Sequence, residues 1–479
     1  MRRYAPVLSS LLLIFALVLT ACAPTAPAGA PPAADAQATD APAAAAPAAD
    51  DAASEGKTKI VWYIGLGAGS QPEAVEKENA FVAEFNRNHP TIELETIIVP
   101  NQQAQQQLAT MIAGGNSPDI IGPVGVGGRA GFTDQLLDLS PYIEEMNVDL
   151  SQYESALVQF YDVPGQGQIG LPFGVFPMVV MYNKDLFDEA GLPYPPAAYG
   201  EQYEGKEWNW ETFTELAKKL TVDANGLDAT QEGFDKDNVV QWGFNFQWGN
   251  DVANVGATWG NGSLVAEDGV TAQFPAAWQE GVQWYYDAMF KDGIAISNPQ
   301  ESAQEIGGNA FSAGRTAMTV TNTWYLCCLN PDVVQNFDFA PMPSNDGTVV
   351  SVLDADTFSI LKGSQHPKEA FEVLMYFLTE GAPQLYDIYQ PLPGLTANQQ
   401  AFFDAQNEKW GTELNWDVVV ESMKSPDIPS TESALPNNLE SRQIVSEFNS
   451  RIFSTPGLDI AQELQGLVTA LQASYDKAQ

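Results

Sequence analysis

Positively charged side chains are scarce in this sequence of 479 residues. Lys and Arg number 21 against 61 Asp and Glu, which gives a formal net charge of -40 at pH 7. A field of this sign repels the phosphates of nucleic acids and the headgroups of anionic lipids, so we exclude nucleic acid as a partner. The same field disfavours an anionic small ligand.

Histidine and cysteine are rarer still. The two histidines, His89 and His366, both precede prolines, and two histidines are too few for a multi-histidine metal site and give no support to a histidine-based triad. The three cysteines, Cys22, Cys327 and Cys328, cannot form a long-range disulfide framework. The adjacent pair could form a vicinal disulfide or remain as two buried thiols, and we expect the thiols.

Long hydrophobic runs are missing after the N-terminus. There, two arginines precede an apolar run at 7–19, which is shorter than the ~20 residues that a bilayer requires and is typical of a secretory signal peptide. The sequence LTAC at 19–22 looks like a bacterial lipobox. We therefore expect residues 1–21 to be a signal peptide and Cys22 to be lipidated, which anchors the chain to the outer face of the plasma membrane. This location is extracytoplasmic, and it is periplasmic if an outer membrane is present.

Residues 22–56 consist almost entirely of Ala, Pro, Asp, Thr and Gln, with no aromatic residue and no apolar period. A segment of this composition cannot bury a core, so we expect a disordered stalk. The chain that follows is long enough to form two domains.

Beyond the stalk, strand patterns alternate with helix patterns. The predicted elements are strands at 59–64 and 92–99, helices at 72–86 and 102–113, and a further short strand that ends at 121. This order predicts a parallel α/β sheet whose strand ends meet in a ligand-binding crevice. The Gly-rich loop at 65–70 lacks the spacing of a dinucleotide-binding fingerprint, so a nucleotide ligand is disfavoured.

The stretch from Gly170 to Leu192 has two interpretations. An apolar run at 175–182, interrupted by Pro177, passes into a helical pattern that ends at Gly191. It is either a buried strand of a large sheet or a crossover between two domains, and its composition leaves both open.

A cluster of oxygen-bearing side chains occurs at 223–237. Asp223, Asn225 and Asp228 surround Gly226, as calcium ligands surround a glycine, but their spacing differs from that of an EF-hand loop. The segment is therefore either a structural calcium site or a solvated acidic turn. We favour the turn and expect no required cofactor.

Aromatic residues are plentiful, with 11 Trp and 16 Tyr. Trp248 and Trp259 lie among Gly and Asn, as in loops that present side chains to a ligand, and Trp324 follows a predicted strand that ends at 320. Sugars pack their C–H faces on aromatic rings and bond polar groups through their hydroxyls, so such positions suit a carbohydrate. Tyr285 and Tyr286 point about 100° apart on a helix, and we expect one in the core and one on the surface.

Five segments occur in a fixed order beyond residue 57. They are GNSPDII at 115–121, LPFGVFPMVVMYNKDLFDEAGLP at 171–193, NWETFTELAKKL at 209–220, FSAGRTAMTVTNTW at 311–324 and FSILKGSQHPKEAFEVLMYFLT at 358–379. Behind a lipobox, this set resembles the extracellular solute-binding lipoproteins of ABC importers, in particular the carbohydrate-binding family that includes the maltose-binding protein.

The resemblance implies an α/β fold of the periplasmic-binding-protein type (class II), with two lobes that each hold a mixed, mainly parallel sheet flanked by helices. It implies a monomer that captures a sugar or oligosaccharide between the lobes by hinge closure and delivers it to the permease subunits of an ABC transporter. On this basis we expect lobe 1 at 57–174 and 342–390, and lobe 2 at 175–341 and 391–479.

The resemblance also carries sugar stacking over to Trp324 and places Phe176 where maltose-type relatives often have an acidic sugar ligand. The other candidates are aromatic and polar residues at predicted strand ends and loops. In order of preference, the expected ligand-binding residues are Trp324, Trp248, Phe176 and Asn322, then Trp62, Tyr63, Gln71, Asp354, Asp356, Trp259 and Asn438.

Two alternatives stay open. The same fold could bind a polyol, a glycerophosphodiester or a ferric ion. An extracellular glycan-degrading enzyme could use a pair of carboxylates, but no spacing in the sequence picks out an acid and a nucleophile, so we expect a binding protein and not an enzyme.

Overall fold

The computed structural model describes residues 56–478 except 154, 164 and 432. The predicted signal peptide at 1–21, the lipidation of Cys22 and all but the last residue of the predicted stalk lie outside the described residues. In the part of the chain that is described, no helix is both long and apolar enough to cross a membrane. The lobe boundaries expected from the sequence stay predictions.

The N-terminal half of the main sheet is parallel. Its strands are β1 (Thr58–Ile64), β2 (Ile92–Ile98) and β3 (Ile120–Val124), with β1 in the middle. Helices α1 (Pro72–Asn88) and α2 (Asn101–Ala113) connect them. The alternation of strands and helices expected from the sequence is confirmed here.

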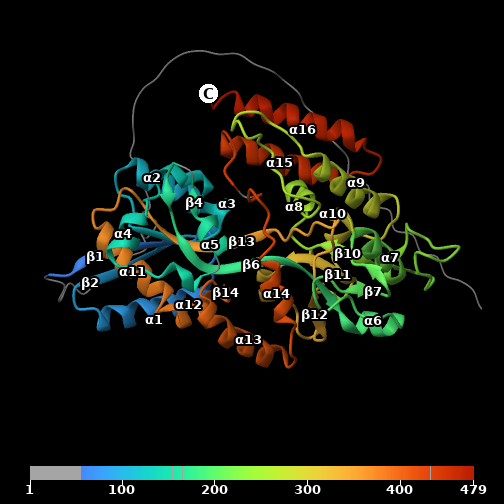
Figure 1. Cartoon of the computed structure of the whole chain (residues 1–479), viewed down its shortest axis with the longest axis horizontal. Coiled ribbons are helices and arrows are strands. Elements are labelled where there is room, and N and C mark those ends of the chain that lie inside the picture. Colours follow the sequence, from blue (N-terminus) through green and yellow to red (C-terminus); the bar gives the residue numbers. More distant parts are fainter. Residues whose placement is uncertain (1–55, 154, 164, 432, 479) are drawn as a thin grey trace, which may run out of the picture. The chain divides into compact units, whose positions relative to one another are not determined.

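Strand β6 (Leu171–Asn183) joins the two halves of the sheet, and each of its residues is buried. Its first part pairs with β13 (Leu353–Ile360) as far as Pro177, and its second part pairs with β11 (Thr316–Asn322) from Met178 onward. Proline has no backbone N–H, and it lies where one partner strand gives way to the next. The stretch from Gly170 to Leu192, for which the sequence left two interpretations open, thus contains a strand that crosses between the halves. Figure 1 shows this strand near the centre of the picture.

The C-terminal half follows β6. Strand β10 (Val239–Phe246) runs parallel to β11 and carries the short edge strand β9 (Val222–Asp223). The whole path is β2-β1-β3-β13-β6-β11-β10-β9, with β12 (Phe337–Ala340) and β14 (Leu392–Pro393) also paired to β6. All antiparallel ladders of this sheet involve β6, β13 or β9. The expected mixed α/β architecture is confirmed.

Helices cover the sheet, and short strands lie beside it. The longer helices are α6 (Lys184–Ala190), α7 (Trp210–Leu220), α9 (Ala276–Phe290), α11 (Pro367–Leu378), α12 (Ala382–Tyr389), α13 (Thr396–Trp410), α14 (Trp416–Ser422), α15 (Asn438–Ile452) and α16 (Ile460–Tyr475). The shorter elements are α3 (Val126–Arg129), η1 (Ala130–Gln135), α4 (Ser140–Glu145), η2 (Leu150–Gln152), α5 (Ser155–Phe160), β4 (Asp162–Val163), β5 (Gly167–Gln168), β7 (Gln202–Tyr203), β8 (Lys206–Glu207), α8 (Val252–Ala257), α10 (Asn298–Glu301) and η3 (Thr323–Cys328).

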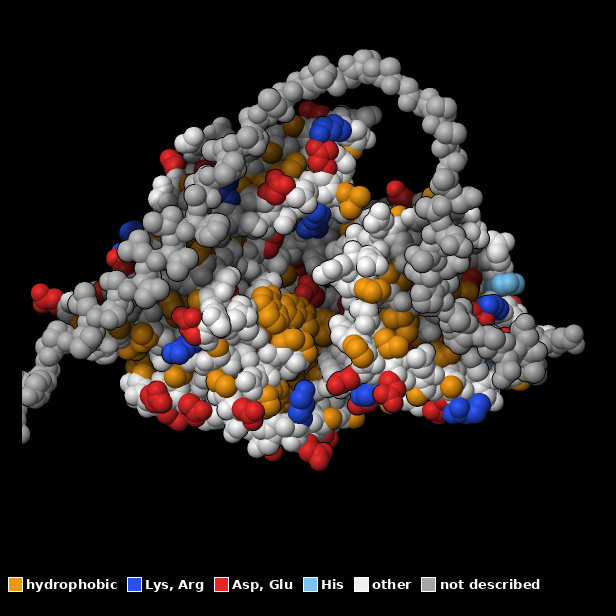
Figure 2. Space-filling view, turned by 180° about the vertical axis from the view of Figure 1, so that it is seen from behind, with side chains coloured by type: hydrophobic (Ala, Val, Ile, Leu, Met, Phe, Trp, Pro, Cys, Tyr) orange, Lys and Arg blue, Asp and Glu red, His pale blue; other side chains and the backbone are white. Residues whose placement is uncertain are grey.

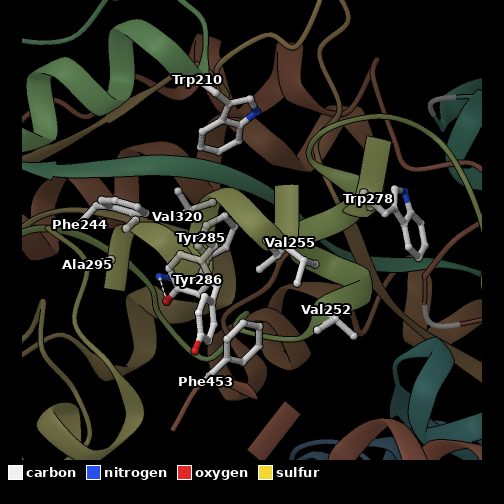
Figure 3. Packing of buried hydrophobic residues seen from close by; sticks show 14 of the residues in the cluster. Trp210, Phe244, Val252, Val255, Trp278, Tyr285, Tyr286, Ala295, Val320 and Phe453 are labelled. Atoms are coloured by element: carbon white, nitrogen blue, oxygen red, sulfur yellow. Dashed lines mark hydrogen bonds between the residues drawn. The ribbon is translucent and has the colours of Figure 1, made fainter. Parts of the chain in front are cut away.

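The largest hydrophobic cluster fills the C-terminal half, and Figure 3 shows Trp210, Phe244 and Tyr285 among its members. Tyr286 is also buried, which corrects the expectation that one of the adjacent tyrosines would lie on the surface. The segment after α15 explains this, because the Tyr286 hydroxyl donates to the Thr455 carbonyl at 2.9 Å and accepts from the backbone N–H of Leu458 at 2.7 Å.

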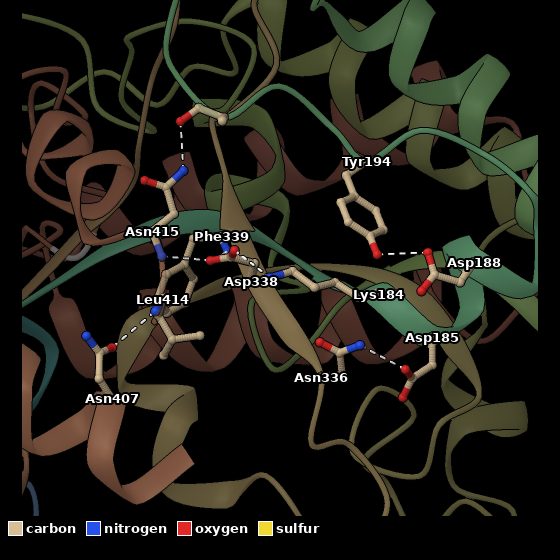
Figure 4. Close-up of polar contacts among 11 residues, drawn as sticks. Lys184, Asp185, Asp188, Tyr194, Asn336, Asp338, Phe339, Asn407, Leu414 and Asn415 are labelled. Carbon is tan, nitrogen blue, oxygen red and sulfur yellow. Dashed lines mark hydrogen bonds and ion pairs between the residues drawn. The ribbon is translucent and has the colours of Figure 1, made fainter. Parts of the chain in front are cut away.

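A shielded ion pair ties the end of β6 to β12. Lys184 Nζ lies 2.8 Å from Asp338 Oδ2, and both side chains are less than a fifth exposed. The other carboxylate oxygen of Asp338 accepts the backbone N–H of Asn415 at 2.7 Å, as Figure 4 shows. These contacts hold α6, β12 and the start of α14 together at the end of the crossover strand.

We expect Lys184→Met to lower the free energy of unfolding by about 2 kcal/mol, because it leaves the shielded Asp338 carboxylate without its cation. Urea denaturation measures the change. The matched control is Lys206→Met, which breaks an exposed pair with Glu215 and should leave stability nearly unchanged. Equal losses in the two variants would contradict this account of the pair.

Candidate functional site

Two tryptophan rings stack at the end of β11. The rings of Trp324 and Trp248 are nearly parallel, with an angle of 8° and centroids 6.1 Å apart. Trp324 lies in η3, directly after β11, and Trp248 lies two residues after β10. The carboxyl ends of the parallel strands β10 and β11 lie side by side. This brings together the two residues placed first among the ligand-binding residues expected from the sequence.

Trp248 is held in an unusual position. Its side chain is 47% exposed and its φ is +56°, a left-handed conformation that costs a bulky residue about 1–3 kcal/mol. Its indole N–H donates to the Gly308 carbonyl at 3.1 Å, and its ring meets that of Tyr325 edge to face. An exposed, strained aromatic residue that the surrounding structure fixes in place is typical of a binding site.

Trp324 is fixed from the other half of the sheet. Its indole N–H donates to Asp354 Oδ2 at 2.7 Å, and Asp354 lies opposite Phe176 in the ladder between β13 and β6. The aromatic pair, the Asp354 carboxylate and Phe176 therefore meet where the chain crosses between the halves. We call Trp248, Trp324, Asp354 and Phe176 the indole site.

Asn322 stabilises the indole site through hydrogen bonds to the backbone next to it. Its side chain is buried, and its amide Nδ2 donates to the carbonyls of Phe176 at 2.7 Å and Val352 at 3.0 Å. Both amide hydrogens are thus used within the protein. This placement argues for a structural role in joining β11 to the two segments that cross between the halves, and against the predicted ligand contact.

A cavity of about 600 Å³ opens near the same crossing. Arg129, Gln159 and Asp162 line it from the N-terminal half, and Asp427 and Ser433 line it from the segment after α14. Figure 2 shows the molecule from behind, where hydrophobic side chains gather beside a hollow near the middle.

Asp427 connects the cavity to the indole site. Its Oδ1 accepts the backbone N–H of Leu353, the residue before Asp354, at 2.8 Å, and its Oδ2 accepts that of Thr431 at 2.7 Å. Burial raises the pKa of Asp427 to about 6, against the lowering effect of these hydrogen bonds. Sequence inspection missed Asp427, although the prolines at 426 and 429 mark its segment as a fixed turn.

A second buried carboxylate lies below the Gly-rich loop between β1 and α1. Glu78 Oε1 accepts the hydroxyl of Tyr389 at 2.6 Å, and a Cβ on Gly69 would lie only 2.5 Å from the same oxygen. Burial raises the pKa of Glu78 to about 7, while the bond from Tyr389 lowers it. Gly69 has a φ of +100°, so the loop requires glycine there both for its backbone and for the close approach of Glu78.

The family described as bacterial extracellular solute-binding protein matches residues 67–382, about two thirds of the sequence. The chain belongs to this family. The match confirms the family resemblance seen in the sequence.

Solved structures share the fold of this solute-binding protein. UspC of M. tuberculosis has a TM-score of 0.66 at 21% identity, over 88% of this chain and 100% of that one. An ABC substrate-binding protein from Listeria monocytogenes, in complex with cycloalternan, has a TM-score of 0.62 at 22% identity, over 88% and 98%. The sugar-binding protein MalE from Xanthomonas citri has a TM-score of 0.66 at 18% identity, over 88% and 98%. The expected two-lobed α/β fold is confirmed.

Among curated sequences, an uncharacterised lipoprotein from Streptomyces antibioticus is 22% identical over 320 residues. The match covers 64% of this chain and 64% of that lipoprotein. The solute-binding protein thus spans slightly less than two thirds of that relative.

Two predicted ligand residues of the solute-binding protein lie in its cores, and a third packs against the largest cluster. Trp62 is fully buried and donates its indole N–H to the Gly122 carbonyl at 2.6 Å, and Tyr63 is fully buried and donates its hydroxyl to the Ala104 carbonyl at 2.7 Å. The burial of these two residues argues against their predicted ligand contacts. Trp259 is only partly buried, and its ring stacks on that of Trp210 against the largest cluster.

The remaining candidates are spread out. Asp356 lies on β13 two residues beyond Asp354, opposite Gly174. Gln71 is exposed at the start of α1, and the Asn438 Oδ1 atom accepts the backbone N–H of Leu435 at the start of α15. Of these three candidates, Asp356 is the one that lies close in sequence to a residue of the indole site, Asp354.

The acidic segment at 223–237 forms a turn. Asp223 Oδ1 accepts the backbone N–H groups of Asn225 and Leu227, and its Oδ2 accepts that of Asp235. In the described residues, no group of three or more His, Cys, Asp or Glu side chains is placed to hold a metal ion. The Asp223 oxygens stabilise the turn, and the calcium interpretation with Asn225 and Asp228 gains no support from this geometry.

The cysteine pair differs from expectation. The sulfur atoms of Cys327 and Cys328 are joined in a vicinal disulfide at the end of η3, and the side chain of Cys327 is exposed. The expectation of two buried thiols is therefore wrong.

The raised pKa of Glu78 predicts a pH-dependent stability. Because the folded protein holds this proton more tightly than the unfolded chain, stability is present near pH 4 and is lost as the pH rises through about 7. We expect Glu78→Gln to remove this loss, so that its stability relative to the wild type rises by up to about 3 kcal/mol between about pH 4 and about pH 8. Urea denaturation across this pH range measures it.

The matched control is Glu76→Gln, on the exposed side of the same helix, whose stability relative to the wild type should hardly change with pH. A parallel change in both variants would show that Glu78 does not carry the effect.

Proposed function

We propose that the protein captures a sugar or oligosaccharide between its two lobes and delivers it to the permease of an ABC importer. The observation that carries the proposal is the indole site, where two stacked and partly exposed indole rings lie beside a carboxylate at the crossing between the halves. Family membership supports the role of solute binding in general.

The chemistry of the indole site suits a carbohydrate. The electron-rich faces of indole rings attract the C–H groups on one face of a pyranose, and a carboxylate accepts hydrogen bonds from its hydroxyls. The Listeria protein was solved with cycloalternan and another neighbour, at 19% identity, with mannotriose. These ligands support an oligosaccharide for this chain as well.

Phe176 gives this site its particular character. It is almost fully buried, and it lies opposite Asp354 in the ladder between β6 and β13. An apolar ring at this point cannot accept a hydroxyl proton, so Asp354 supplies the acceptor from the neighbouring strand. We propose that an apolar residue at 176, with the hydrogen-bond acceptor at Asp354 instead, makes the preferred sugar different from that of maltose-type relatives.

The alternation of β6 between two partner strands supports hinge closure. β6 crosses between the halves in the described part of the chain, and hinge motions concentrate at such crossings. Closure would bring residues of the N-terminal half, including those around the cavity at Arg129, toward a sugar seated on the indoles.

The place of the protein in the cell is part of the proposal. Lipidation of Cys22 would hold the protein at the outer face of the plasma membrane, and a stalk at 22–56 would let it reach its permease. The Streptomyces relative, which is called a lipoprotein, supports this placement. We propose that the protein acts as a monomer, that it needs no cofactor, and that it returns its ligand unaltered and is not an enzyme.

The first test is Trp248→Ala, measured by isothermal titration calorimetry against neutral mono- and oligosaccharides. Loss of one stacking face should weaken binding about tenfold or more, a change of about 1.4 kcal/mol. The melting temperature without ligand should change little, because the side chain is half exposed.

The matched control is Tyr194→Ala, which removes another partly exposed aromatic ring from the C-terminal half and should leave sugar affinity unchanged. Unchanged sugar affinity in Trp248→Ala would remove the indole site from the proposal. Release of shorter glycans during incubation with the wild-type protein would replace it with the hydrolase alternative.

A further inference from the structure

The vicinal disulfide lies on the same side of η3 as the indole site. Side chains three residues apart in a 3₁₀ helix point in the same direction, and Cys327 follows Trp324 by three residues. Both side chains have exposed surface, whereas Tyr325 and Leu326 between them are buried. The sulfur atoms thus extend the surface that Trp324 presents.

Hydrogen bonds connect the disulfide to the second indole. The Cys328 carbonyl accepts the side-chain amide of Asn309 at 3.1 Å, and the Asn309 Oδ1 atom accepts the hydroxyl of Tyr325. The neighbouring residue, Gly308, accepts the indole N–H of Trp248 at 3.1 Å. The loop that contains Gly308 and Asn309 therefore contacts both η3 and Trp248 and fixes their relative position.

We propose that the Cys327–Cys328 disulfide positions both indoles for ligand binding and forms the edge of the carbohydrate platform. The bond closes a small covalent ring over two adjacent backbone units, which fixes the end of η3. Without it, these residues gain conformational freedom that ligand binding must remove again. The affinity of the site therefore depends on the oxidation state of the pair.

The chemical step is a two-electron reduction. A dithiol reductant such as dithiothreitol gives up two electrons and two protons and becomes a cyclic disulfide, while the bond between Cys327 and Cys328 breaks to give two thiols. An oxidising extracytoplasmic compartment preserves the bond. The proposal for affinity rests on the proposed function, but the positioning of the indoles can be tested without any sugar.

The first experiment compares the purified protein before and after dithiothreitol, without ligand. Peptide mass analysis after iodoacetamide should show Cys327 and Cys328 alkylated only after reduction. Acrylamide quenching of tryptophan fluorescence should increase on reduction, because the indoles lose their fixed position, and should not respond in Cys327→Ser/Cys328→Ser. Alkylation without reductant, or quenching that is the same in both states of the wild type, would overturn the proposal.

The second experiment measures affinity for an oligosaccharide that binds the oxidised protein. Reduction should weaken binding about tenfold, and reoxidation should restore it, with the melting temperature without ligand nearly unchanged. Equal affinity in the two states would overturn the proposal. If no sugar binds the oxidised protein, the proposed function fails, and the quenching experiment still decides whether the disulfide positions the indoles.

Discussion

The structure depends on one buried strand that must find backbone partners along its entire length. β6 is buried at each of its 13 residues, and unpaired backbone groups in such a position would each cost about 1–3 kcal/mol. Four strands meet this need, β13 and β14 along the first part and β11 and β12 along the second. Pro177, which has no N–H to pair, lies where the sets of partners change.

This constraint also builds the indole site. Asp354 belongs to a strand that pairs with the first part of β6, and Trp324 follows a strand that pairs with the second part. The hydrogen bond between them spans the change of partners, and Asn322 reinforces it through the carbonyls of Phe176 and Val352. In the proposed function, a rotation of one half against the other would act on these contacts, so ligand capture and the hinge would share the same residues.

The sequence predicted the strands and helices of the N-terminal half and picked out Trp248 and Trp324 as candidates, because their signals are local, but it did not predict that the two rings stack on each other. Glycine and asparagine around Trp248 indicate a loop, and a strand that ends just before Trp324 places this residue at the carboxyl end of a sheet strand. The burial of Trp62 and Tyr63, which the sequence did not predict, also has a physical reason. Successive residues of β1 enter two different hydrophobic clusters on opposite faces of the sheet, so a strand buried on both sides looks the same in sequence as one that borders a cleft.

Other parts of the site require knowledge of distant contacts. Glu78 and Tyr389 are over 300 residues apart, and Asp427 meets Leu353 only because the segment after α14 returns to the crossing. The adjacent cysteines carry no sequence signal that separates a disulfide from two thiols.

A crystal structure of the protein with a bound oligosaccharide tests the central claim most directly. The account predicts a pyranose ring packed on the exposed indole surface of Trp248 and Trp324, with a hydroxyl within hydrogen-bond distance of Asp354. A sugar that occupies another part of the molecule and touches neither indole would contradict it.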